Sequence, residues 1–294
     1  MVTCNAAHVA LTGPPSGALW CGMARDDSVR ELVDRLEIPF NALGVDPYGI
    51  SKRHLVVFHS ALAFLYRHYF NVRAYGVQHV PPRGRAMVVG NHSGGVALDG
   101  AMVIASMLLE MDPPRLAQGM AEKFLNVLPL SSLWTMRTGH FTGTPENAIR
   151  LLEDERMLMV FPEGARGTAK LYKERYSLVD FGTGFMRLAM RTRTPIIPFA
   201  FLGGGSAIPT VYNSYTLGRL LGVPYVPFTP YGPPLPLPAP LEVHYGEPMV
   251  FEGTGNEEDT VIYVHVEKVK ERIATLIADG RRTRDAHHKG GVLS

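Results

Sequence analysis

The sequence is poor in cysteine, in net charge and in long apolar runs. Its two cysteines, Cys4 and Cys21, lie near the start, which excludes a cysteine-based zinc site and a disulfide scaffold and suits a reducing compartment. The formal net charge is only +2, so no nucleic-acid partner is expected. No stretch reaches the roughly 18–20 uninterrupted apolar residues that cross a bilayer. The chain is therefore not an obvious integral membrane protein.

The first 27 residues also lack the positively charged start of a secretory signal, and prolines break their apolar runs. The composition, 46% hydrophobic and 19% charged, lies on the apolar side of ordinary soluble proteins. A chain of 294 residues can bury a large core, but its length does not decide between one domain and two. We interpret residues 1–50 as a partly irregular N-terminal extension, 51–280 as a single domain and 281–294 as a mobile basic tail.

Short apolar strands alternate with helices over most of the chain. Strands are predicted at 72–75, 86–89, 157–161, 196–201 and 241–245, and helices at 99–110, 147–153, 181–191 and 259–278. A shorter helix capped by Asp26 or Asp27 is predicted to end near Leu36. This alternation predicts an α/β fold with a mixed, mostly parallel central sheet flanked by helices. Residues 203–240, rich in glycine, proline and tyrosine, are predicted to form a long ordered excursion.

Residues 51–70 form a stronger helical pattern, with an apolar body and basic residues at both ends. Such a helix is about 30 Å long at 1.5 Å per residue. One interpretation is a helix that packs against the core. The other is an N-terminal membrane-facing helix whose apolar body enters lipid and whose cationic ends meet phosphates.

A glycine-rich turn follows the strand predicted at 86–89 and carries His92. Loops at the carboxyl ends of strands are where α/β sheets place their sites. On a continuous helix His92 and Asp99 would lie about 10 Å apart, but glycines between them allow the chain to fold back. Asp99 can then orient His92 as a general base, and the nucleophile comes from the substrate. The alternative is a helix-capping aspartate and a loop histidine without a catalytic role.

A second strand, at 157–161, also ends in a turn that carries charge. Glu163 and Arg166 follow it, with Gly164 between them. Arginine suits bidentate binding of phosphate, and glutamate can accept a hydrogen bond from a hydroxyl or position the arginine. The alternative is a surface ion pair, worth roughly 0–1 kcal/mol.

Together the two segments resemble the glycerolipid and lysophospholipid acyltransferase superfamily, which carries a His…Asp block and a Phe-Pro-Glu-Gly-x-Arg block. Residues 137–147 and 194–198 are similar to the second and fourth blocks of that family, and the four blocks occur in the family order. Residues 46–49 and 203–250 further resemble the diacylglycerol acyltransferase-like branch.

The resemblance implies an acyltransferase that moves a fatty acyl group from a thioester to a hydroxyl of a glycerolipid or lysophospholipid. His92 would be the general base, since an imidazole with its ordinary pKa of about 6.5 can accept a proton near neutral pH, and Asp99 would stabilise the imidazolium. Backbone N–H groups of the glycine-rich turn would stabilise the oxyanion. Substrate-binding roles fall to Glu163, Gly164, Arg166, Arg137, Lys123 and Gly143.

No metal or cofactor is implied, and acyl-coenzyme A or acyl carrier protein would be a co-substrate. We also predict peripheral attachment to the cytoplasmic face of a membrane through residues 51–70.

Two departures from the family pattern bear on the acceptor. The six residues between His92 and Asp99 exceed the common family spacing. The arginine of the second block is replaced around Gly143 by threonines, which weakens the case for a phosphorylated acceptor. The alternatives to a transferase are a lipid-binding or scaffold protein on the same fold and a hydrolase that gives the acyl group to water.

Overall fold

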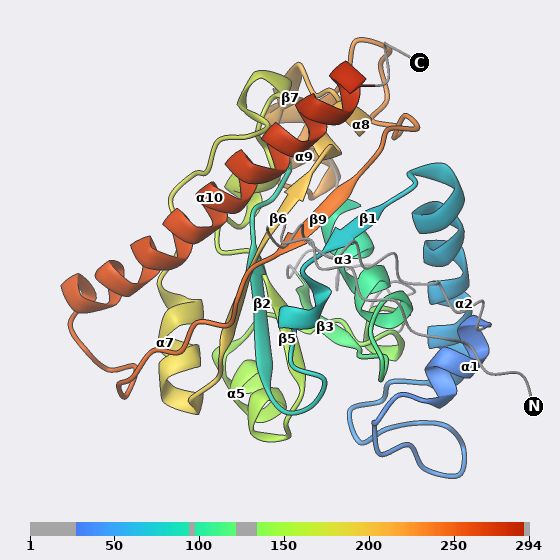
Figure 1. Ribbon diagram of the computed structural model, residues 1–294, viewed down its shortest axis with the longest axis vertical. Coiled ribbons are helices and arrows are strands. Elements are labelled where there is room, and N and C mark those ends of the chain that lie inside the picture. The colour runs from blue at the N-terminus through green and yellow to red at the C-terminus, as the bar shows by residue number, and fades with distance from the viewer. Residues whose placement is uncertain (1–27, 94–97, 122–133, 291–294) are drawn as a thin grey trace, which may run out of the picture.

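The computed structural model describes residues 28–93, 98–121 and 134–290 (Figure 1). Its centre is a seven-stranded sheet in the order β1-β9-β6-β2-β5-β3-β4. The strands are β1 (Arg73–Tyr75), β2 (Ala86–Gly90), β3 (Ala117–Ala121), β4 (Phe141–Thr142), β5 (Met157–Val160), β6 (Ile196–Leu202) and β9 (Glu242–Tyr245). All neighbours pair in parallel except β6 and β9, so the sheet is mixed and mostly parallel, as predicted.

Helices cover both faces of this sheet (Figure 1). The helices are α1 (Val29–Asp34), α2 (Lys52–Phe64), α3 (Leu98–Leu109), α5 (Pro145–Glu153), α6 (Ala165–Thr168), α7 (Gly184–Thr192), α8 (Gly204–Ala207), α9 (Tyr215–Leu221) and α10 (Asp259–Gly290). Successive residues of a strand point to opposite faces. Val88 of β2 therefore packs with α2 and α3, whereas Val89 packs with α5, α7 and α10. Central strands buried on both faces need continuous apolar runs, which is what β2, β5 and β6 have.

The excursion at 203–240 is ordered, as predicted. It contains α8 and α9 and a small two-stranded antiparallel sheet of β7 (Tyr212–Ser214) and β8 (Val226–Phe228). In Figure 1 these elements lie together at one end of the molecule. Since the excursion leaves from the carboxyl end of β6, it lies at the sheet edge where the parallel strands end.

The predicted strands at 72–75, 86–89, 157–161, 196–201 and 241–245 are confirmed with shifts of one residue at their ends. Strands β3 and β4 were not predicted. The sequence of β3, Ala-Gln-Gly-Met-Ala, has low intrinsic strand propensity, and β4 is only two residues long. Pairing with β5 decides the conformation of β3.

The helices predicted at 99–110, 147–153 and 181–191 are observed as α3, α5 and α7, with ends shifted by up to three residues, and two further helix boundaries also differ. Ser28 caps α1 and forms a capping box with Glu31, whereas the caps predicted at Asp26 or Asp27 lie outside the described residues. The helix predicted to end at 278 continues through 290 as α10, so most of the predicted mobile tail is helical.

A contact with the excursion explains the extra turns of α10. The Arg284 guanidinium donates two hydrogen bonds to the carbonyl oxygen of Pro240 and lies 3.6 Å from the carboxylate of Glu242. Residues 291–294 lie outside the described part of the chain.

The helix predicted at 51–70 is confirmed as α2 followed by a π-helical turn at Leu65–Tyr69. One face is buried in the core through side chains that include Leu55, Leu62 and Tyr66. The core-packing interpretation is therefore correct for that face. Among the described residues, no helix combines the length and the apolar character that crossing a membrane requires.

Candidate active site

The site begins where β2 ends, next to β6. The Asn91 side chain is buried, accepts a hydrogen bond from the N–H of Phe201 and donates one to the Phe201 carbonyl oxygen, at 2.8 and 3.1 Å. These two bonds continue the strand ladder through a side chain. They fix the chain direction just before His92 and allow it to leave the sheet at a defined point.

His92 and Asp99 are in contact. His92 Nδ1 lies 2.9 Å from Asp99 Oδ2, so Nδ1–H donates to the carboxylate and Nε2 is left as the basic nitrogen. The N–H groups of Ser93 and Gly100 also donate to this carboxylate. The longer His–Asp gap thus still permits the predicted pairing, because Asp99 opens α3 and faces back toward β2.

The Asp99 carboxylate is fully buried, yet it is held in its charged form. Burial alone opposes ionisation, but the His92 ring and the backbone N–H groups of Ser93 and Gly100 outweigh it and lower the pKa of Asp99 below its ordinary value. A permanent negative charge at Nδ1 is suited to stabilise an imidazolium at His92.

The aromatic ring of Phe161 fixes the plane of the His92 ring. The two rings stack at 3.9 Å between centroids with a 10° interplanar angle. The His92 side chain keeps 11% of its surface exposed, and no described residue hydrogen-bonds Nε2. The imidazole is therefore held on one face and at one nitrogen, while its other nitrogen is open.

Glu163 lies beside His92 with its carboxylate turned into the protein. Its carboxylate is buried and takes hydrogen bonds from the N–H of His92, the N–H of Val179 and the ammonium of Lys170. All distances are 2.9–3.0 Å, and the Lys170 and Glu163 side chains are 2% and 0% exposed. With both oxygens engaged by the protein, Glu163 fixes the backbone of His92. It pairs with Lys170 and not with Arg166, and its contact with a substrate stays a prediction.

Lys170 was missed from the sequence because it lies outside the motif, and nothing in its neighbours marks it as buried. Its ammonium uses its third donor on the Ser177 carbonyl oxygen, 3.0 Å away. Lys170 thereby ties the turn after β5 to the segment that leads into α7.

The acyltransferase family model matches residues 71–202. An uncharacterized protein of Mycobacterium tuberculosis is 31% identical over 240 residues, which cover 78% of this chain and 67% of that protein. The chain belongs to the acyltransferase family. An uncharacterized protein of Mycobacterium leprae is 30% identical over the same length, covering 65% of that protein.

A solved structure shows that the acyltransferase shares its fold with a known enzyme. The 1-acyl-sn-glycerophosphate (LPA) acyltransferase PlsC from Thermotoga maritima is 17% identical and superposes with a TM-score of 0.52. The match covers 78% of this chain and 82% of that one. At this identity the likeness concerns the fold alone.

Two glycines of the acyltransferase permit the turn after β5. Gly164 adopts φ +56° and ψ −153°, a backbone conformation that side chains disfavour. At Gly167 a Cβ atom would lie 2.8 Å from the Cβ of His92 and 2.6 Å from that of Glu163. The predicted site residue Gly164 therefore shapes the turn, and Gly167 allows α6 to approach His92.

Arg166 is exposed at this same edge, as a ligand-binding residue would be. One of its guanidinium nitrogens donates to the carbonyl oxygen of Asp180 at 3.1 Å. This single contact leaves further N–H groups of Arg166 available, so a phosphate-binding role stays a prediction.

Of the other predicted site residues, Arg137 and Gly143 lie on other segments than His92, and the rest lie outside the described chain. Arg137 donates to the carbonyl oxygen of Gly49, and its own carbonyl accepts from Ser51, which ties it to the turn before α2. Gly143 is exposed between β4 and α5. Lys123 and the glycine-rich turn at 94–97, where the oxyanion donors were predicted, lie outside the described residues.

The excursion contacts the site from the β6 side. A Cβ atom at Gly204 would lie 2.0 Å from Ser93 Oγ, so the first turn of the excursion packs directly on the His92 loop. Tyr225 reaches the same region: burial raises its pKa to about 12, and the negative charge of Asp99 acts in the same direction.

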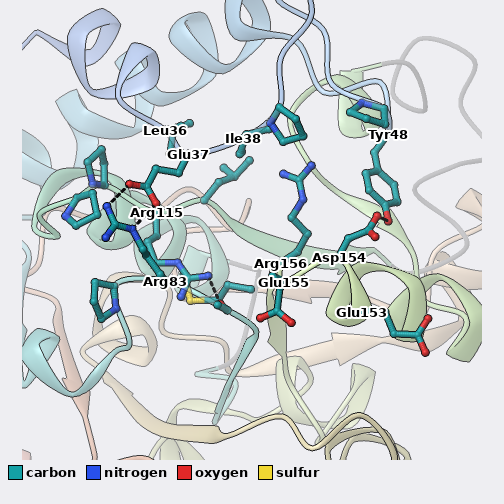
Figure 2. Close-up of a pocket in the computed structure, with 18 residues that line it drawn as sticks. Leu36, Glu37, Ile38, Tyr48, Arg83, Arg115, Glu153, Asp154, Glu155 and Arg156 are labelled. Atoms are coloured by element: carbon teal, nitrogen blue, oxygen red, sulfur yellow. Dashed lines mark hydrogen bonds and ion pairs between the residues drawn. The ribbon is translucent and has the colours of Figure 1, made fainter.

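A cavity of about 570 Å³ lies at the opposite ends of β2 and β5, away from His92 (Figure 2). It is lined by the segment that follows α1 and by the residues that precede these strands, such as Arg83 and Arg156. At about 3.3 Å per residue it is roughly 25 Å from His92 along β2. Two of its arginines are already paired with carboxylates, Arg83 with Glu37 (Figure 2) and Arg156 with Asp46. We therefore assign the candidate active site to the His92 edge.

Proposed function

We propose that this acyltransferase moves a fatty acyl group from an acyl thioester to a hydroxyl of a glycerolipid or lysophospholipid, with His92 as general base. The observation that carries the proposal is the His92–Asp99 contact at 2.9 Å, with Nε2 open and the ring stacked on Phe161. Neither a helix-capping aspartate nor a loop histidine requires this arrangement.

In the proposed reaction, Nε2 of His92 accepts the hydroxyl proton as the acceptor oxygen attacks the thioester carbonyl. The C–O bond forms, the C–S bond breaks, and the thiolate leaves with the proton that His92 returns. Asp99 holds the tautomer and stabilises the imidazolium between these steps. Glu163 and Lys170 hold the backbone of His92 and thereby its position.

The donor would be acyl-coenzyme A or acyl carrier protein, and Arg166 would bind its phosphate. Arginine suits this role because its planar fork matches two phosphate oxygens. The exposed Arg166 guanidinium near the His92 edge supports this assignment.

We further propose a neutral acceptor and the diacylglycerol acyltransferase-like branch. Arg137 lies beside the turn before α2 and donates one hydrogen bond to Gly49, whereas the exposed turn around Gly143 has threonines where the family pattern has arginine. The threonines favour an acceptor without a phosphate. The finer placement among branches depends on the acceptor found by experiment.

Peripheral attachment to the cytoplasmic face of a membrane is part of the proposal. The outward side of α2 exposes Val57 and Phe64 and continues to Tyr69 of the π-helical turn, which supports contact of residues 51–70 with lipid. Basic side chains at both ends of this segment suit lipid phosphates.

The proposal is tested by incubating purified protein with an acyl thioester and a mixed pool of lipid alcohols, followed by mass spectrometry of the lipids. We expect a new ester whose formation is lost in His92→Ala. Thioester loss that is insensitive to added acceptor would instead identify a hydrolase. No product above the His92→Ala control would indicate a lipid-binding or scaffold protein.

A further inference from the structure

The described residues expose an uneven distribution of large apolar side chains. Nine of the twenty that are strongly exposed lie between residues 211 and 237, in the excursion. Among them are Leu220 at 80%, Leu235 at 67% and Leu221 at 62% exposed. Exposed apolar patches of this density on a folded protein mark interaction surfaces.

We call these nine exposed side chains together the excursion surface: Val211, Tyr212, Tyr215, Leu220, Leu221, Phe228, Tyr231, Leu235 and Leu237. Tyr212 of β7 packs against Phe228 of β8 with ring centroids 6.1 Å apart. Tyr231 donates to the carbonyl oxygen of Leu235 at 2.8 Å. Backbone pairing of β7 with β8 and local hydrogen bonds thus hold these apolar groups in place.

The charge of this segment is equally unusual. Residues 203–240 contain no aspartate, glutamate, lysine or histidine, and their one charged residue is Arg219, which is exposed. The segment at 165–175 packs beside it, through the Ala169 carbonyl and Asn213, and adds Arg166 and Lys173 to its border. An apolar and tyrosine-rich face with a basic border fits an anionic lipid surface.

The position of the surface agrees with that partner. Gly204 packs on Ser93 beside His92, so the excursion surface and the candidate active site share one sheet edge. The hydroxyl of Tyr69 donates to the carbonyl oxygen of Pro236 at 2.7 Å, which joins the excursion to the outward side of the segment at 51–70.

We propose that the excursion surface is the principal membrane-docking face of this protein and sets the His92 edge against a bilayer that contains anionic lipid. The inference rests on the proposed function for its choice of lipid as partner. It differs from attachment through 51–70 alone, because the core-facing side of α2 is buried and the helix exposes few large apolar groups.

The test is flotation of the full chain with vesicles of equal parts phosphatidylcholine and phosphatidylglycerol. We expect the wild type to float with the vesicles, and the double variant Leu220→Glu/Leu221→Glu to bind at least about tenfold more weakly, since each leucine loses apolar burial and gains a repelled charge. Leu235→Glu, on a separate segment, should weaken binding in the same direction.

Val250→Glu is the matched control. Val250 is 70% exposed, and it follows Met249, which pairs with the start of β6, at the end of the strand away from the excursion. This variant adds the same charge and should float like the wild type. Circular dichroism and thermal melting check that each variant is folded.

Four outcomes would overturn the proposal. Undiminished flotation of Leu220→Glu/Leu221→Glu would be one. A loss of vesicle binding in Val250→Glu equal to that in the double variant would be another. The third is a wild type that forms a dimer by analytical ultracentrifugation, fails to float, and becomes monomeric in the double variant, because the surface would then face a second copy. Loss of binding in Phe64→Glu with no loss in the double variant would move the principal face to α2 and also contradict the proposal.

Turnover of a short-chain, monodisperse acceptor separates this inference from the proposed function. The double variant should keep wild-type turnover on that acceptor while it loses vesicle binding. If the wild type floats with vesicles but shows no acyl transfer, the docking proposal stands and the proposed function is wrong.

Discussion

The two ends of the parallel strands differ in how their charged groups are arranged. At the carboxyl ends of β2 and β5, Asp99 and Glu163 are buried, and each is held by backbone N–H groups as well as by an imidazole or an ammonium. At the other ends, arginines that line the cavity in Figure 2 form a buried ion pair, Arg156 with Asp46, and exposed pairs such as Arg83 with Glu37.

The difference teaches that a preorganised set of hydrogen-bonded groups, and not the presence of a cavity, distinguishes a candidate active site. Around the cavity, cations such as Arg83 and Arg156 are each paired with a carboxylate. At the His92 edge, hydrogen bonds engage both carboxylate oxygens of Asp99 and of Glu163 and leave Nε2 of His92 open. Preorganisation of this kind is what catalysis by a general base requires.

The largest expected effect would come from removing the negative charge of Asp99 at the His92 edge. Asp99→Asn should lower kcat of acyl transfer by about 10²–10⁴-fold, because an amide neither fixes the His92 tautomer nor stabilises an imidazolium. The measurement is initial rate at saturating thioester, with thermal melting as a check of folding. Arg83→Gln, at the cavity, is the control and should keep its kcat. A folded Asp99→Asn protein with undiminished kcat would remove Asp99 from the proposed mechanism.

A second prediction concerns the buried pair behind His92. Lys170→Met should lower the free energy of unfolding by about 3–5 kcal/mol, because Glu163 would remain buried without its cation. Denaturant unfolding measures this loss. The double variant Lys170→Met/Glu163→Gln should lose less than the sum of the single variants, since it leaves no unpaired charge. A loss below about 1 kcal/mol for Lys170→Met would mean that the pair is not buried as described.

Two other imidazoles, those of His59 and His140, have hydrogen-bond partners other than a carboxylate. His59 lies against the Leu55 carbonyl and His140 against the Thr138 hydroxyl, and burial lowers the pKa of each to about 4. The unfolded chain then binds protons at higher pH than the folded one. Their contribution to stability is therefore complete above about pH 6.5 and is lost as pH falls toward 4, by up to about 3 kcal/mol for each.

Denaturant unfolding at a series of pH values would measure this loss. His59→Gln should flatten the decline, because one titrating group is gone. A decline of equal steepness in the variant and the wild type would show that His59 is not the buried neutral imidazole described here.

The smallest effect is expected for the exposed pair at the cavity. Arg83→Gln should leave the melting temperature unchanged within error, since the Arg83 and Glu37 side chains are 72% and 49% exposed and water screens their attraction. A clear fall in melting temperature would show that the two ends of the sheet are more alike than their burial indicates.

The sequence predicted the fold class and the long central strands because these strands are continuous apolar runs buried on both faces. It also placed His92 and Asp99 at one strand end. It did not predict β3, whose conformation depends on pairing with β5, or the last turns of α10, which Arg284 fixes against Pro240. Such contacts join residues that are distant in sequence and leave no local pattern.

The sequence by itself determined which chemical groups the candidate site contains: the imidazole of His92, the carboxylates of Asp99 and Glu163, and the guanidinium of Arg166. Only the tertiary structure decided how they are used. Asp99 pairs with His92 because α3 begins beside the end of β2, whereas Glu163 turns inward to Lys170 and the His92 backbone. The physical reason is burial: an ionised carboxylate inside the protein must take every donor within reach, and folding alone determines which donors those are.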